Sequence, residues 1–280
     1  MQQHSKQQNN QTTKQPNDKP TMKITIIGSG NVATHLALRL KNIGEQIAQV
    51  YSPHPAHAEA LAHKTGCEAV TSVDAINDDS DIYLFSIKDD ALPVVAKEVE
   101  NHIGKTHKHI FIHTAGSVPM DVFSGITDCY GVIYPMQTFS KDRAVDFVKI
   151  PCFIEASDCF DTLSIIEGMA KRISAKVQHV DSEKRKRLHL AAVFANNFTN
   201  HCYRLAEKML EGTDVPLSMY LPLIEETANK VREMSPRDAQ TGPMVRNDVT
   251  VMERQLALIP DERTKKLYRL MAESIHEDSK

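Results

Sequence analysis

The sequence contains no tryptophan, only five cysteines, and no apolar run that approaches the ~18 residues needed to span a bilayer. The cysteines are Cys67, Cys129, Cys152, Cys159 and Cys202. Their odd number and the absence of a Cys-x-x-Cys pair argue against a disulfide framework and a structural zinc site, so we expect reduced thiols and no metal. The N-terminus also lacks the apolar core of a secretory signal, which favours a cytoplasmic protein with no membrane partner.

An excess of charge of one sign is also missing. The chain has 33 basic and 36 acidic residues, a formal net charge of −3, and both signs are spread along its length. Proteins that bind nucleic acids or anionic membranes usually collect basic residues on one surface, so neither partner is expected here. With 280 residues, of which 41% are hydrophobic, the chain can bury a sizeable core and suggests roughly two domains.

Three regions differ in composition. Residues 1–21 are dominated by Gln, Asn, Thr and Lys and are expected to form a disordered tail, because they offer almost no apolar surface to bury. Residues 22–180 alternate strand and helix patterns, which is typical of an α/β domain with a mostly parallel sheet covered on both faces. Residues 181–280 show helical patterns only, so an all-helical domain is expected after Val180.

The boundaries of these elements follow from periodicity and from turn residues. The predicted strands span residues 23–27, 46–51, 81–87, 109–113, 128–134, 149–156 and 176–180. The predicted helices between them span residues 31–42, 55–65, 90–101 and 158–173, and the later helical segments span about 182–211, 217–234 and 245 to the C-terminal region.

The first strand leads into a glycine-rich turn and an amphipathic helix. Gly28 would make the tight turn, Gly30 has no Cβ to block an approaching pyrophosphate, and Ala33 allows the helix to pack close to the strand. Free N–H groups and the positive end of the helix dipole would then face the phosphates. The turn is therefore predicted to bind a dinucleotide, with contacts from Gly28, Ser29, Gly30, Asn31, Val32 and Ala33. A turn needed only for packing is the alternative.

The end of the second strand bears on the choice of dinucleotide. NAD enzymes place an acidic residue on the ribose about 20 residues after the glycine motif, but no acid occurs between Gln46 and Ala58. Ser52 and His54, with help from His57, could instead donate hydrogen bonds to a 2′-phosphate. The pattern favours NADP over NAD, although the arginine that commonly holds the phosphate is missing and Pro53 stands in its place.

Polar residues follow the next three predicted strands. Ligands of open α/β sheets bind beyond the carboxyl ends of the strands, so these residues are expected at the same cleft. Those expected at the cofactor are Ser86, Lys88, His113 and Thr114, and those expected at a substrate are Ser117 and Gln137. Tyr134 precedes a proline, and its hydroxyl is a candidate proton donor or a contact at the rim of the cleft. The neighbouring Asp89 and Asp90 have a competing role as caps of the following helix.

The helical region carries two polar clusters. The charge run at residues 181–187 is expected to be solvated, whereas the stretch rich in Ala, Val and Phe that follows is expected to be buried. His189, Asn196 and Asn197 lie in that stretch and would form either a cleft-facing patch or interhelical hydrogen bonds. Arg246 could hold a carboxylate or pair with Asp248, which also suits the start of the next helix.

These residues together carry a family resemblance. Its motifs are Gly28-x-Gly30-x-x-Ala33, Asp89-Asp90, His113-Thr114-Ala115-Gly116, Pro135-Met136-Gln137-Thr138-Phe139, the helix from His189 to Asn197-Phe198, and Thr241-Gly242-Pro243-x-x-Arg246-x-Asp248. Over about residues 22–275 the chain resembles proteins with a Rossmann-like N-terminal domain and a helical C-terminal domain of unknown function. That group is similar to the deazaflavin-dependent NADP oxidoreductases and, more distantly, to the ketopantoate, pyrroline-5-carboxylate and β-hydroxyacid reductases.

The sequence departs from this family pattern at three places. Tyr134 stands where the family generally has a histidine, and Asn247 stands where it usually has a glycine. Asparagine tolerates a positive φ better than most residues, so the backbone requirement at Asn247 can still be met. The Lys-x-x-x-Asn pair of the β-hydroxyacid and ketopantoate reductases is absent, because Ala192 and Val193 stand four residues before the two asparagines.

The resemblance implies an oxidoreductase that transfers a hydride between NADPH and a small carbonyl or imine compound. In this hypothesis His189 supplies the proton, Asn196 or Asn197 polarises the substrate, and Arg246 holds a carboxylate. The resemblance also implies a homodimer formed through the helical domain. The alternative is a dinucleotide-binding sensor or scaffold without turnover, which the missing lysine and the presence of Tyr134 favour.

Overall fold

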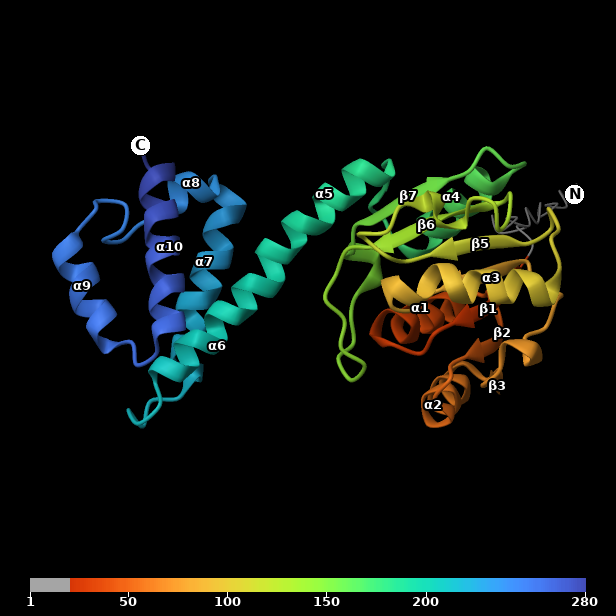
Figure 1. The fold of residues 1–280 in the computed structure, drawn as a ribbon, viewed down its shortest axis with the longest axis horizontal. Coiled ribbons are helices and arrows are strands. Elements are labelled where there is room, and N and C mark those ends of the chain that lie inside the picture. Colours follow the sequence, from red (N-terminus) through yellow and green to blue (C-terminus); the bar gives the residue numbers. More distant parts are fainter. Residues whose placement is uncertain (1–20) are drawn as a thin grey trace, which may run out of the picture. The chain divides into compact units, whose positions relative to one another are not determined.

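The computed structural model describes residues 21–280 and builds the first part of the chain around one eight-stranded sheet (Figure 1). The strands are β1 (Lys23–Ile27), β2 (Gln46–Tyr51), β3 (Glu68–Val70), β4 (Ile82–Phe85), β5 (Ile110–His113), β6 (Tyr130–Pro135), β7 (Cys152–Ala156) and β8 (Val177–His179). They are ordered β3-β2-β1-β4-β5-β6-β7-β8, and all neighbouring pairs are parallel except β6 and β7. The predicted α/β class with a mostly parallel sheet is confirmed.

The seven predicted strands are all present, and β3 is the one that the sequence analysis missed. This edge strand has three residues and pairs only with β2 among the described strands. Such a short segment cannot show the alternation of apolar and polar side chains that indicates a strand. The predicted tail lies outside the described residues except for Thr21.

Helices cover both faces of the sheet, as the alternation of strand side chains requires (Figure 1). On one face, Ile24, Ile82 and Leu84 pack in a core with α1 (Asn31–Asn42), α2 (Pro55–Thr65) and α4 (Thr162–Ile173). On the other face, Tyr83, Phe85 and Phe111 pack against α3 (Leu92–Ile103) and the 3₁₀ turn Met120–Phe123. Strands β1 to β6 run in the same direction and therefore end at the same edge of a sheet that is buried on both sides.

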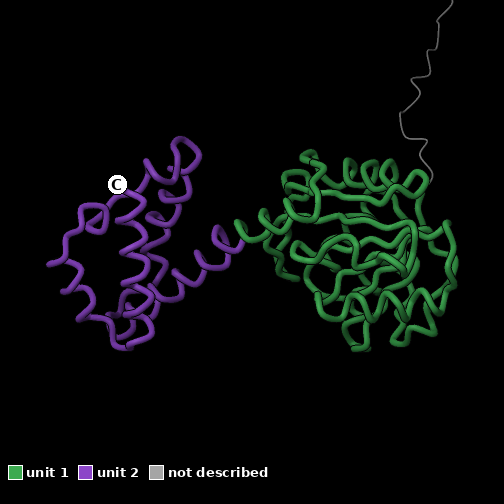
Figure 2. Tube along the Cα trace, turned by 45° about the horizontal axis from the view of Figure 1, so that its top comes forward, with its two compact units in different colours: residues 1–192 green, residues 193–280 purple. Residues whose placement is uncertain are grey.

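The chain divides into two compact units, residues 1–192 and residues 193–280 (Figure 2). Helix α5 (Ser182–Ala192), which the sequence analysis placed in the helical domain, belongs to the first unit. The second unit contains the π-helical segment η5 (Val193–Phe198), the 3₁₀ turn Leu217–Tyr220, α6 (Thr199–Met209), α7 (Leu221–Glu233), α8 (Pro236–Ala239), α9 (Val249–Leu258) and α10 (Glu262–Asp278). Pro260 lies between α9 and α10, and it interrupts the last predicted helical segment because proline cannot continue a helix.

Large apolar side chains of the second unit remain exposed in the single chain. Phe194 and Phe198 are 62% and 51% exposed, and of residues 193–280, all of which the structure describes, only Ile259 and Ala272 are buried. The prediction that the stretch after the charge run is buried is therefore wrong for the isolated chain. A sequence pattern shows that a face is apolar, but it does not show whether the same chain covers that face.

Two cysteines are joined, which corrects the expectation of reduced thiols. Cys129 lies just before β6 and Cys159 just after β7, and because β6 and β7 are antiparallel, both residues reach the same edge of the sheet. Their Cα atoms are 5.0 Å apart and their sulfur atoms form a disulfide. Cys67, Cys152 and Cys202 are free. The spacing of 30 residues carries no sign of this pairing, since strand pairing creates it.

To cross a membrane, a helix must have sufficient length and hydropathy. Among residues 21–280, no helix is both long and apolar enough to cross a bilayer.

Candidate functional site

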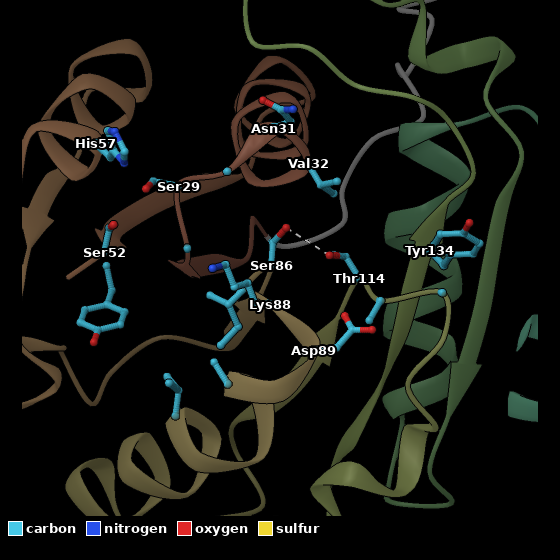
Figure 3. Close-up of a pocket in the computed structure, with 18 of the residues that line it drawn as sticks. Ser29, Asn31, Val32, Ser52, His57, Ser86, Lys88, Asp89, Thr114 and Tyr134 are labelled. Atoms are coloured by element: carbon cyan, nitrogen blue, oxygen red, sulfur yellow. Dashed lines mark hydrogen bonds between the residues drawn. The ribbon is translucent and has the colours of Figure 1, made fainter. Parts of the chain in front are cut away.

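A cavity of about 840 Å³ opens at the edge of the sheet where β1, β2, β4, β5 and β6 end. Figure 3 shows side chains from several of these strand ends around the same hollow. The predicted residues that line it are Gly28, Ser29, Gly30, Asn31, Val32, Ser52, His54, Ser86, Lys88, Thr114, Ser117, Tyr134, Gln137 and His189. This edge is the place where open α/β sheets bind their ligands.

The turn between β1 and α1 leaves the start of α1 open. Gly30 is the N-cap of this helix, no side chain caps it, and its first turn contains no acidic residue. A Cβ built on Gly30 would meet no atom within 4 Å, so the space beside the helix N-terminus is empty of protein. The uncapped N–H groups and the positive end of the helix dipole therefore face this space, an arrangement that binds anions.

Gly28 and Ala33 serve the backbone of the same turn. Gly28 has a φ of +117°, and a Cβ there would lie 2.3 Å from the main-chain oxygen of Ser86. Only glycine avoids both the strain and the clash, which explains the tight turn. Ala33 is completely buried in the core beneath α1, so it permits the close packing of helix and strand and does not line the cavity.

The end of β2 forms a wall without acidic side chains. Ser52 is buried, and its hydroxyl oxygen accepts a 3.3 Å hydrogen bond from the main-chain N–H of His54. The His54 and His57 rings stand edge to face with centroids 5.5 Å apart. Asp89 is the one acidic residue among those that line the cavity, and Lys88 and Lys141 are the two lysines. The charged groups of the walls thus favour an anionic ligand.

Side chains that follow β4 form hydrogen bonds with side chains that follow β5. The Thr114 hydroxyl donates a 3.1 Å hydrogen bond to the Ser86 hydroxyl (Figure 3). The Ser117 hydroxyl donates to a carboxylate oxygen of Asp89. Helix α3 begins after Ala91 with no side-chain cap. The alternative in which Asp89 and Asp90 cap this helix is therefore wrong, and Asp89 instead orients Ser117.

His113 lies in the sheet and does not line the cavity. Its side chain is completely buried, its Nδ1 accepts a 3.2 Å hydrogen bond from the main-chain N–H of Ala115, and its Nε2 has no partner among the described residues. Burial, with a smaller contribution from the charge of Arg185, lowers the pKa of His113 to about 3. The ring is therefore neutral at physiological pH and packs against Phe123 at a centroid distance of 5.6 Å.

Tyr134 and His189 form a hydrogen-bonded pair at one end of the cavity. The Tyr134 hydroxyl lies 2.9 Å from Nδ1 of His189, and the two rings meet edge to face with centroids 5.8 Å apart. Burial raises the pKa of Tyr134 against an opposing effect of the Arg185 charge, so the hydroxyl keeps its proton. A Cβ on Gly116 would lie 2.5 Å from Nδ1 of His189 and 2.9 Å from Cζ of Tyr134. Only glycine at position 116 leaves room for this pair.

A buried ion pair fixes the helix that carries His189. Arg185 is completely buried, which contradicts the expectation that the whole charge run 181–187 is solvated. Its guanidinium donates to Glu155 of β7 and, at 2.6 Å, to the main-chain oxygen of Val118. Ser182 also donates to Glu155, at 2.9 Å. These contacts anchor the first turn of α5 to the sheet, and His189 follows one turn further on.

Four predicted residues lie in the second unit, whereas the residues that line the cavity all belong to the first. Asn196 and Asn197 are exposed in the π-helical segment, and Arg246 is also exposed. Asp248 is the N-cap of α9 and accepts a 3.2 Å hydrogen bond from the main-chain N–H of Val251. Arg246 forms no ion pair within the described chain.

The backbone at Asn247 bears out one expectation from the sequence. Its φ is +51°, the left-handed conformation that the family glycine would adopt easily. Asparagine is one of the few other residues that tolerate this conformation.

Several cavity residues were not singled out as site residues from the sequence. They are Tyr51, Pro53, Ile87, Ala91, Val95, Ala115, Gly116, Pro135 and Lys141. For Asp89, which also lines the cavity, the sequence allows either a place at the cleft or a role as a helix cap. Gly116 belongs to a quoted motif, but its role depends on two side chains that are distant in sequence. Lys141 lies in a loop without periodic pattern, so no sequence signal points to it.

Comparisons with known proteins agree with this arrangement. Residues 23–115 match the family model described as NADP oxidoreductase, coenzyme F420-dependent, and residues 150–275 match that of a domain of unknown function (DUF2520). The chain is 43% identical to a putative NADP oxidoreductase from Bacteroides fragilis of known structure, over 92% of this chain and 98% of that chain, with a TM-score of 0.87. No curated protein sequence matched the chain.

Two more distant solved structures share the fold. One is a pyrroline-5-carboxylate reductase from Coxiella burnetii, with 16% identity, coverage of 93% of this chain and 98% of that chain, and a TM-score of 0.58. The other is an imine reductase from Myxococcus stipitatus in complex with NADP⁺, with 17% identity, coverage of 92% of both chains, and a TM-score of 0.62.

Proposed function

This chain belongs to the protein family in which a Rossmann-like domain of the NADP oxidoreductase type precedes a helical domain of unknown function, and we propose that it transfers a hydride between NADPH and a small carbonyl or imine compound. The observation that carries the proposal is the pairing, in one cavity, of an open helix N-terminus at Gly30 with the Tyr134 and His189 pair. The first feature suits a diphosphate, and the second suits a proton transfer.

The residues present fit a phosphorylated nicotinamide dinucleotide. The space beside Gly30 is free of protein atoms, and a cavity of about 840 Å³ extends from there to the Tyr134 and His189 pair. Ser52, His54 and His57 line the cavity after β2, and no acidic residue lies among them. A 2′-phosphate there would meet hydrogen-bond donors and no repelling carboxylate. We infer a preference for NADP over NAD on this ground. The cofactor would supply the hydride chemistry.

His189 is the proposed proton donor to the substrate. Because the pKa of Tyr134 is raised, its hydroxyl remains protonated, and in our proposal it donates to Nδ1 of His189, which lies 2.9 Å away. That hydrogen bond leaves the ring proton of a neutral His189 on Nε2. As this proton passes to the developing oxygen or nitrogen anion of the substrate, the hydroxyl proton of Tyr134 would move to Nδ1, so that the imidazole stays neutral and the negative charge is left on the Tyr134 oxygen. Tyr134 thus selects the tautomer, and the contacts of Arg185 position the helix.

Residues of the second unit are proposed to polarise and hold the substrate. Asn196 or Asn197 would polarise the substrate carbonyl, and Arg246 would hold a substrate carboxylate in a bidentate contact. All three side chains are exposed. A π-helical segment such as the one around both asparagines is rare and is found frequently at functional sites, which supports their assignment.

We also propose that the chain forms a homodimer through residues 193–280. A stable domain normally buries its large apolar side chains, but in this unit many of them are exposed. Those exposed by half or more are Phe194, Phe198, Met219, Leu221, Leu223, Val231, Val249, Leu258 and Leu270. A second copy of the chain would cover them, and sedimentation of a dimer at micromolar concentration is the expected result. A monomer would contradict this part of the proposal.

The activity is tested by oxidation of NADPH over a panel of small carbonyl and imine compounds, with and without a carboxylate group. We expect turnover with at least one of them by the wild type and a loss of about 10²–10⁴-fold in the His189→Gln variant, with NADPH binding retained. An equal rate in the variant would contradict the role of His189. Binding without oxidation of NADPH by any compound would favour the alternative of a sensor, which the missing lysine before Asn196 already supports.

A further inference from the structure

Three side chains that can bind metals meet at the edge of the sheet opposite the cofactor cavity. His107 precedes β5, Cys129 precedes β6 and Cys159 follows β7, so strand pairing brings together three segments that are distant in sequence. One ligand atom from each lies within 4.8 Å of the others. The Sγ atom of Cys129 is also 3.6 Å from the main-chain oxygen of His107.

The surroundings of these three residues are open and acidic. A cavity of about 500 Å³ is lined by His107 and Cys159 together with Asp128, Asp158 and Phe160. A carboxylate oxygen of Asp128 lies 3.5 Å from Nδ1 of His107, and its other oxygen lies 3.1 Å from Nζ of Lys105. An ion in this cavity can therefore reach His107 and Cys159, and the carboxylate of Asp128 stands next to the imidazole. Cys129 is buried, but its Sγ atom lies within 4.8 Å of the other two ligand atoms.

Phe160 lies beside the group in an unusual conformation. It has a φ of +41° and is 79% exposed, and its ring lies 5.4 Å from that of His107. An aromatic residue rarely adopts this backbone conformation or this exposure. Its ring meets the imidazole edge to face, so an apolar side chain stands beside the ligand His107.

We propose that His107, Cys129 and Cys159 form a zinc site when the disulfide is reduced, with Asp128 as the fourth ligand. In the disulfide the sulfur atoms carry no thiolate and do not bind a metal. A phosphine reductant would cleave the sulfur–sulfur bond and be oxidised to the phosphine oxide with oxygen from water, which leaves two thiols. The thiols lose two protons when they bind the ion, so that two thiolates, one imidazole and one carboxylate surround it.

Chemistry makes zinc the expected ion. Two thiolates and an imidazole form a soft ligand set that selects zinc over magnesium or calcium, and four ligands suit its tetrahedral geometry. The site does not appear in sequence motifs because its ligands come from three segments rather than from a Cys-x-x-Cys pair. Disulfide and metal would exclude each other, so binding of the ion would report the redox state of the cysteine pair.

The test uses the full chain and cobalt as a spectroscopic probe. The protein is reduced with a phosphine under anaerobic conditions, freed of reductant, titrated with Co²⁺ and followed by its thiolate-to-cobalt absorption, and zinc is then added as a competitor. We expect one Co²⁺ per reduced chain, displacement by zinc, and no thiolate absorption with the oxidised protein. Cys159→Ser should lose the absorption, and His107→Gln should weaken binding at least about tenfold.

Cys67→Ser is the matched control, because Cys67 is a partly exposed free thiol outside the group. It should bind Co²⁺ like the wild type. His107 is exposed, so its replacement tests the site without disturbing the core. Absence of thiolate-to-cobalt absorption in the reduced wild type, or its persistence in Cys159→Ser, would overturn the proposal. NADPH binding at the opposite edge of the sheet should be unaffected in all variants, so the outcome is independent of the proposed oxidoreductase function.

Discussion

Replacement of Gly30 by aspartate should separate ligand binding from folding. Gly30 is the N-cap of α1, its backbone is extended with a φ of −73°, and a Cβ would meet no atom within 4 Å. Aspartate is a better N-cap than glycine by a few tenths of a kcal/mol, and its charge suits the helix dipole by about 0.3–1 kcal/mol. The free energy of unfolding of Gly30→Asp should therefore rise by roughly 0.5–1 kcal/mol.

The same carboxylate would oppose the binding of a diphosphate. It would accept hydrogen bonds from the N–H groups that a phosphate needs, and it would place a negative charge in the empty space beside the helix. Two like charges about 4 Å apart repel by roughly 4 kcal/mol near a protein surface, which corresponds to a loss of affinity of about 10³-fold. NADPH binding measured by calorimetry should weaken by this order.

Gly44→Asp is the control with the same change in charge. Gly44 follows the other end of α1, a distance of roughly 18 Å along a 12-residue helix. Its φ of +91° makes aspartate unfavourable by about 1 kcal/mol, but no atom lies within 4 Å of its Cβ. The two variants should therefore show opposite patterns in urea denaturation and calorimetry. Unchanged affinity for NADPH in Gly30→Asp would refute the assignment of the helix N-terminus as the diphosphate site.

Three further predictions concern the residues beneath and beside the cavity. Ser52→Asp should weaken NADPH more than NADH in competitive titrations, because its carboxylate would repel a 2′-phosphate and accept hydrogen bonds from ribose hydroxyls; equal weakening of both would contradict the role of the β2 wall. Arg185→Ala should lower the free energy of unfolding in urea by roughly 3 kcal/mol, because Glu155, whose side chain is only 16% exposed, keeps its charge without its partner, whereas the exposed Lys184→Ala should stay within about 0.5 kcal/mol. The pKa of His113 is about 3 in the folded chain, against an ordinary value of 6.5. Between these two pH values the unfolded chain binds a proton at His113 that the folded chain does not bind. The stability that the neutral, buried ring contributes is therefore complete above pH 6.5 and is lost as the pH falls toward 3. Between pH 7 and pH 5 the wild type should lose about 2 kcal/mol more than His113→Asn in urea denaturation, and parallel curves would contradict the burial of a neutral ring.

The framework of the first unit was predictable because local signals agree with it. The runs 23–27 and 46–51 are apolar strands closed by turn residues, and the glycine turn at Gly28 and Gly30 joins the first of them to an amphipathic helix. Each of these features depends on neighbours within a few residues, so periodicity and turn chemistry are sufficient. The family resemblance drawn from the motifs is likewise confirmed.

Two of the errors, at the cysteines and in the charge run, have a common physical cause, since each depends on contacts between distant segments. The pairing of β6 with β7 joins Cys129 to Cys159, and the packing of α5 on the sheet buries Arg185 in a run of charges. The pairing of Tyr134 with His189 also spans 55 residues, although both were candidates. The exposure of Phe194 is a different case, because an apolar residue in the sequence carries no information about which chain covers it.

The most direct test of the central claim is a parallel calorimetric titration of the wild-type chain with NADPH, NADP⁺, NADH and NAD⁺. The account predicts micromolar binding at one site per chain, with preference for the two phosphorylated forms, because the β2 wall holds donors and no acid. Binding of none of the four would contradict the assignment of the cavity to a nicotinamide dinucleotide, and with it the proposed hydride transfer.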